Sequence, residues 1–140
     1  MLGIAGREAD IVGVNPNLTA GVIGPEAAAD ATAAATDRKL EWLRHAAGPR
    51  FGDLELNTLV FAVQITESSE ATRTAAEMLG GLFGLTADDM LEVPHALIGT
   101  IDEVCERLEE RRDRWGLSYT VVQSGALDGL APVVERLSGR

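Results

Sequence analysis

The sequence is poor in cysteine and in positive charge, and each shortage excludes a class of protein. Cys105 is the single cysteine, so the chain forms no internal disulfide. Twelve Lys and Arg against 22 Asp and Glu leave a net charge of −10, which offers no basic surface to nucleic acid or to an anionic membrane. No apolar run is long enough to span a bilayer, and Arg7, Glu8 and Asp10 interrupt the first apolar segment. These absences predict a soluble, cytoplasmic protein.

The most informative stretch, residues 99–123, is typical of a helix that leads directly into a buried strand. Thr100 and Glu103 have the spacing of a capping box at the start of a helix, and Gly116 is suited to end it. The charged residues between them predict a solvated face, and we expect the positive run 107–114 to be exposed. The apolar residues recur at helical spacing and predict one buried face, namely Ile101, Val104, Cys105, Leu108 and Trp115.

The same helix-then-strand pattern occurs three times. The predicted strands are Ile11–Asn15, Leu56–Ile65 and Tyr119–Gln123. We expect 119–122 to be buried on both faces, because it has no polar alternation. The predicted helices span 2–9, 36–48, 68–82 and 86–91 in addition to 100–115, with Gly80 and Gly81 as the stop of the helix 68–82 and 15–35 as a long loop. Strands that alternate with helices predict an α/β fold with parallel strands and right-handed crossovers.

Familiar catalytic and metal-binding motifs are absent. There is no GxGxxG, Walker loop, HExxH, CxxC or GxSxG pattern. His45 and His95 have no second ligand at metal spacing, which favours structural or solvated roles, and Cys105 lies on the predicted buried helix face. Motifs alone therefore assign no reaction.

Three stretches resemble the carboxyl-terminal part of luciferase-like (LLM class) flavin or deazaflavin oxidoreductases, a (β/α)8 barrel family. They are LGIAGREADIVGV, LELNTLVFAVQIT and HALIGTIDEVCERLEERRDRWGLSYTVV, of which the last is the most specific. The resemblance implies that residues 1–140 are the carboxyl-terminal portion of such a barrel, a partial TIM barrel with its last three strands and their helices. Strands one to five, which hold most of the coenzyme pocket in the family, would be absent.

Catalytic side chains in barrels lie at the carboxyl ends of the strands, so polar residues that close the apolar runs are the candidate binding residues. The alternative is that each merely caps its strand. No general base or nucleophile is evident. His95, in the loop before Gly99, would reach the pocket from above. The candidates are Asn15, Gln64, Gln123 and His95, with Thr66 and Ser124 as weaker ones.

The resemblance implies hydride transfer between a coenzyme and a small organic substrate. The expected coenzyme is an 8-hydroxy-5-deazaflavin of the F-420 type, with FMN as the alternative. Because three strands leave sheet edges open, we expect a homo-oligomer without turnover of its own. Two other hypotheses stay open: a non-catalytic partial-barrel oligomer, and an unrelated small α/β ligand-binding domain. The second would need a phosphate-binding loop after its first strand, which Val14-Asn15-Pro16 does not resemble.

Overall fold

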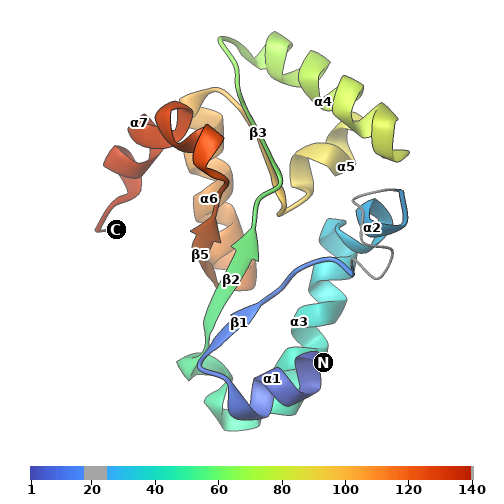
Figure 1. The fold of residues 1–140 in the computed structure, drawn as a ribbon, viewed down its shortest axis with the longest axis vertical. Coiled ribbons are helices and arrows are strands. Elements are labelled where there is room, and N and C mark those ends of the chain that lie inside the picture. The colour runs from blue at the N-terminus through green and yellow to red at the C-terminus, as the bar shows by residue number, and fades with distance from the viewer. Residues whose placement is uncertain (18–24, 140) are drawn as a thin grey trace.

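The computed structural model describes residues 1–17 and 25–139 and shows an α/β protein (Figure 1). All five predicted helices are present, whereas the strand Ala96–Gly99 and the helix Leu127–Leu137 are absent from the sequence prediction. Part of the predicted 15–35 loop is helical, and its residues 18–24 lie outside the described ones. In chain order the elements are α1 (Leu2–Glu8), β1 (Ile11–Gly13), α2 (Pro25–Asp30), α3 (Ala33–Ala47), η1 (Gly48–Asp53), β2 (Glu55–Leu59), β3 (Ala62–Ile65), α4 (Ser69–Phe83), α5 (Ala87–Glu92), β4 (Ala96–Gly99), α6 (Ile101–Trp115), β5 (Leu117–Val121), η2 (Ser124–Ala126) and α7 (Leu127–Leu137).

Three parallel strands form the first sheet, in the order β1-β2-β5. Gly13 pairs with Asn57 on one side of β2, and Tyr119 pairs with Asn57 on the other. A register shift between Leu56 and Asn57 places Ser118 in a bulge of β5. The predicted parallel arrangement of the three strands is therefore confirmed.

The predicted strand Leu56–Ile65 is one extended segment with two sets of partners. Its second half, β3, pairs in parallel with β4, so that Ala62 lies opposite Ala96. Backbone groups of successive strand residues point to opposite sides. Val60 N–H donates to Val121 O of β5, and Phe61 N–H donates to His95 O on the other side. Strand β4 therefore lies on the same side of the long strand as β1, nearer to the carboxyl end of that strand.

One face of the β1-β2-β5 sheet is covered by helices and the other is open. Helices α1, α3 and α6 all pack on the covered face. On the open face Ile11 is 54% and Tyr119 44% exposed, so the expected burial of 119–122 on both faces is wrong. Strand β5 is at the sheet edge, and no described element lies over its second face. The core of the covered face is Val12, Val14, Leu40, Leu43, Leu56, Trp115 and Leu117.

Helix α6 begins and ends as predicted. Thr100 Oγ1 accepts from Glu103 N–H at 3.3 Å, Glu103 Oε2 accepts from Thr100 N–H at 2.8 Å, and Gly116 closes the helix in the left-handed conformation. Val104, Cys105 and Trp115 are buried, and Ile101 and Leu108 are partly buried. The predicted exposure of 107–114 is wrong at Arg111, which is buried.

Helix α4 does not stop at Gly80-Gly81 as predicted but continues to Phe83 and ends at Gly84, whose φ is 73°. Gly80 is needed for a close approach, because a Cβ there would lie 2.7 Å from Leu85 O. Among residues 1–17 and 25–139, no helix has the length and apolar character needed to cross a membrane.

The packing of α3 on the sheet can be tested at Leu43, which is fully buried and contacts α1 at Gly6, where a Cβ would lie 3.1 Å from Leu43 Cδ1. We expect Leu43→Ala to lower the free energy of unfolding by about 2–5 kcal/mol, because it leaves a cavity between two helices and the sheet. The matched control, Leu82→Ala on α4, removes a side chain that is 69% exposed and should change stability by less than about 0.5 kcal/mol. Urea denaturation of both variants measures the difference, and equal losses would contradict this packing.

Candidate functional site

The carboxyl ends of β1 and β5 lie at the same level on the two sides of Leu59. Asn15 follows β1, and its Oδ1 accepts from Leu59 N–H at 3.1 Å, which replaces a backbone acceptor just where β1 ends. On the other side Val121 pairs with Leu59, and Gln123 comes two residues later. Both amide side chains are exposed. The structure therefore brings Asn15 and Gln123 to one rim, with Ser124 directly after it in η2.

Gln64 is not level with this rim. It pairs with Ile98 in the β3–β4 extension, five residues beyond Leu59 along the long strand. At about 3.3 Å per residue, this separation is roughly 16 Å. Figure 1 shows β3 running past the end of β2 towards α4. Gln64 is therefore near the carboxyl end of its strand, as expected, but it does not share a rim with Asn15 and Gln123, because the long strand continues where its neighbours stop.

His95 lies inside the protein and not above the rim. It is 3% exposed and stands directly before β4. Its Nδ1 lies 3.0 Å from Leu59 O and 3.1 Å from Thr58 Oγ1. A carbonyl only accepts, so Nδ1 carries the proton and Nε2 is left as an acceptor without a partner among the described residues. Since Leu59 N–H binds Asn15, the backbone of one residue connects two of the predicted candidates.

Burial lowers the pKa of His95 to about 4. The nearby positive charges of Lys39 and Arg111 act in the same direction, while the hydrogen bond to Leu59 and the charge of Asp30 oppose it. Lys39 is itself buried and binds Asp30, with its Nζ 2.8 Å from Asp30 Oδ2. The His95 ring is therefore neutral near pH 7 and is part of the buried core.

A polar cluster lies at the carboxyl ends of β3 and β4. Of its interactions, the sequence predicted only the capping role of Glu103. Beyond its capping role, Glu103 accepts from Thr72 Oγ1 at 2.7 Å, and Thr72 Oγ1 lies 2.7 Å from Thr66 Oγ1. Although burial raises the pKa of Glu103, hydrogen bonds from Thr100, Thr72 and Ser69 outweigh it and hold that pKa at about 2. The carboxylate thus occupies the point where α4 and α6 begin, and it joins the two helices.

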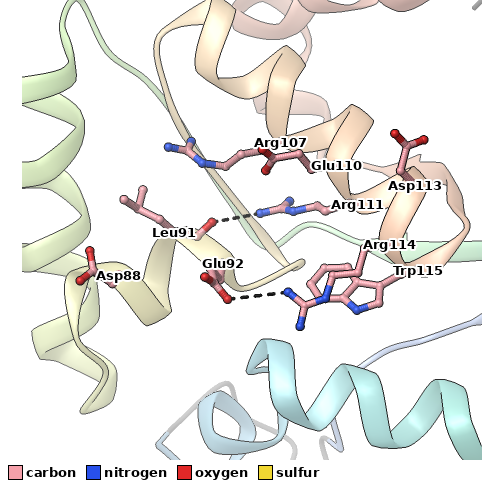
Figure 2. Close-up of a pocket in the computed structure, with 9 residues that line it drawn as sticks. All are labelled: Asp88, Leu91, Glu92, Arg107, Glu110, Arg111, Asp113, Arg114 and Trp115. Carbon is pink, nitrogen blue, oxygen red and sulfur yellow. Dashed lines mark hydrogen bonds and ion pairs between the residues drawn. The ribbon is translucent and has the colours of Figure 1, made fainter.

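A groove of about 810 Å³ lies between α5 and α6 (Figure 2). Its arginines already have partners. Arg111 donates to Val93 O at 2.8 Å and to Ala96 O at 2.9 Å, and burial lowers its pKa to about 10. Arg114 binds Asp37 at 2.7 Å and lies 3.9 Å from Glu92. The groove is lined by Asp88, Leu91, Glu92, Arg107, Glu110, Arg111, Asp113, Arg114 and Trp115.

Sequence reasoning missed Arg111 because it lies in a run of charged residues. The one available signal is its spacing of four residues before the buried Trp115, which puts it on the inner side of α6. In the structure its guanidinium donates to the carbonyl groups of Leu91, at the end of α5, and of Val93, before β4; Val93 O also accepts from Ala96 N–H. Arg111 therefore holds β4 in place. Within the described ranges, no group of three His, Cys, Asp or Glu is arranged to hold a metal ion.

The buried neutral His95 should make stability depend on pH. Its pKa is about 4 in the folded protein and 6.5 in the unfolded chain, so the unfolded state binds more protons between these values and stability rises with pH there. We expect the free energy of unfolding to fall by about 1.2 kcal/mol as the pH drops from about 6 to 5.

Urea titrations at several pH values measure this slope. His95→Asn should remove it, because an amide does not titrate but still donates to Leu59 O. His45→Asn, at an exposed position of α3, should retain it. A slope that persists in His95→Asn would mean that a different group is responsible.

Comparison with known proteins adds no family to this geometry. No protein-family model, no curated protein and no solved structure matches the chain. The functional assignment therefore depends on the order of the strands, the position of the helices and the residues at the rim.

Proposed function

We propose that residues 1–140 form part of the wall of a luciferase-like oxidoreductase barrel. The observation that carries this proposal is the arrangement of the first sheet. Its strands follow one another in chain order, β1-β2-β5, with β4 pairing with β3 outside this sheet, and α3 and α6, the helices that precede β2 and β5, pack on the same face. A barrel wall is built in this way, since each βα unit is added in the same direction. In a doubly wound sheet the order reverses and helices cover both faces.

The rim offers suitable chemistry for the coenzyme. Asn15 and Gln123 supply neutral amide donors and acceptors at the carboxyl ends of their strands. Leu59 and Phe61, which alternate with buried residues of the long strand, are half-buried and give an apolar surface near the rim. Such a surface suits the ring of a deazaflavin of the F-420 type, or of FMN as the alternative. When bound, the coenzyme would supply hydride transfer to or from a small organic substrate.

The protein would orient the coenzyme and exclude water from one side of it. Within the described residues no acid–base pair lies at the rim, because His95 is buried and Glu103 is engaged with Thr72 and Thr100. Three strands are only part of an eight-stranded wall, so we expect the 140-residue chain alone to have no turnover and to associate with copies of itself. From its composition we expect it to act in the cytoplasm. A non-catalytic oligomer with the same partial wall is the second candidate.

Titration with reduced and oxidised coenzyme, followed by absorbance and fluorescence, tests the proposal in the longest form that the gene encodes. Gln123→Ala should weaken binding about fivefold, the equivalent of one hydrogen bond of about 1 kcal/mol. Gln64→Ala is the matched control, because it removes the other glutamine at an exposed position away from the rim, and it should leave the dissociation constant unchanged.

Two results would count against this assignment. The absence of any spectral change with both the deazaflavin and FMN would remove the oxidoreductase proposal and leave the non-catalytic candidate. Equal weakening by both glutamine substitutions would mean that the rim at Asn15 and Gln123 is not the binding surface.

A further inference from the structure

We propose that copies of this chain associate head to tail, with the free edge of β5 in one copy pairing in parallel with the free edge of β1 in the next. This inference rests on the proposed barrel wall and identifies its partner surface. The two strands are the outer ones of the β1-β2-β5 sheet. Within one chain they do not pair, because β2 lies between them. In two copies, the same pairing continues the sheet with every strand parallel.

Backbone groups at both edges are available for this pairing. Val121 O accepts from Val60 N–H, so the neighbouring residues Thr120 and Val122 direct their backbone groups away from β2. On β1, Val14 N–H donates to Asn57 O, so Ile11 and Gly13 direct theirs outwards. For these outward groups, the described residues provide no strand partner. Such edges are templates for another strand.

Exposed apolar side chains are most numerous in the two edge strands and the helices next to them in the chain. Of the nine large apolar side chains that are exposed among the described residues, six belong to the elements at these edges. The other three, Trp42, Met78 and Leu82, lie on α3 and α4. Several large exposed apolar side chains on neighbouring elements are suited to an association surface. The six are Met1, Ile4 and Ile11, in β1 and in or directly before α1, and Tyr119, Leu127 and Val134, in β5 and α7.

The β5 edge also has a groove of about 330 Å³ next to it. It is lined by residues of α6, β5 and α7, among them Val133, Val134 and Leu137 of α7, Thr120 of β5, and the charged Glu109 and Arg112 of α6. In the extended sheet, α1 of the next copy directly precedes its β1, as in this chain, and would lie beside α7 of the first copy. The groove and the exposed face of α1, with Ile4, would therefore bury apolar surface together. A second copy would supply both the strand and the helix that precedes it, whereas an unrelated strand would supply only the first.

The association would also extend the rim. Parallel pairing brings the carboxyl end of β1 of a second copy next to that of β5, so that Asn15 of the second copy and Gln123 lie on one continuous rim. The edge-to-edge contact is heterologous, since different surfaces of the two copies meet. A heterologous contact can be distinguished by experiment from the contact in a symmetric dimer.

Light scattering coupled to size exclusion tests the interface in salt that screens the net charge of −10. The unmodified chain should have a mass at least twice 14.8 kDa. Ile11→Lys blocks one edge and Tyr119→Lys the other, and each alone should give a monomer. A lysine at an exposed strand edge is tolerated by folded proteins, and circular dichroism checks that both variants fold. Leu82→Lys, at an exposed position of α4, is the matched control and should remain associated.

Mixing the two edge variants is the decisive step. Each retains the edge that the other has lost, so the mixture should form a one-to-one dimer and no larger species. A monomeric unmodified chain would overturn the proposal, as would loss of association in Leu82→Lys. Dissociation by only one edge variant, or failure of the mixture to associate, would point to a symmetric contact and overturn it as well. Coenzyme titration is independent of these results, so failure of the interface and failure of the proposed function are distinguishable.

Discussion

The extended segment 55–65 is the constraint on which the rest of the structure depends. Every other strand pairs with it and with no other described strand: β1 and β5 on the two sides of its first half, and β4 beside its second half. Backbone N–H and C=O groups must find partners when they are buried, so the path of this segment decides where each neighbour begins and ends. Asn15 and His95 are examples, since both bind the backbone of Leu59 where β1 gives way to β4.

Buried polar side chains provide hydrogen-bond partners for backbone groups in several places. Arg111 binds carbonyl groups around the start of β4, and Glu103 joins the beginnings of α4 and α6. Each is an ionisable group whose pKa moves away from its usual value, to about 10 and about 2 respectively. Perturbed pKa values often indicate catalytic groups, but structural networks produce them too. Here the partners are backbone groups and neighbouring threonines, which favours positioning of the loops over acid–base chemistry.

The open face and the two free edges distinguish this arrangement from a closed α/β domain. Parallel sheets are usually covered on both faces. Here helices cover one face only, and exposed apolar residues such as Ile11 and Tyr119 remain on the other. A barrel wall has this asymmetry, because its inner face packs against the opposite strands. The same asymmetry supports both the proposed membership of a barrel and the proposed association between copies.

Local features were determined by the sequence itself. The capping box at Thr100, the end of α6 at Gly116 and the start of α4 at Ser68 depend on residues within one helical turn, and all were predictable. The parallel strands of the first sheet followed from the alternation of segments. Tertiary structure alone decided that the four-residue β4 is a strand, that Arg111 and His95 are buried, and that one face of β5 is uncovered. These outcomes depend on which groups the fold brings opposite each other, over separations of tens of residues that no local pattern records.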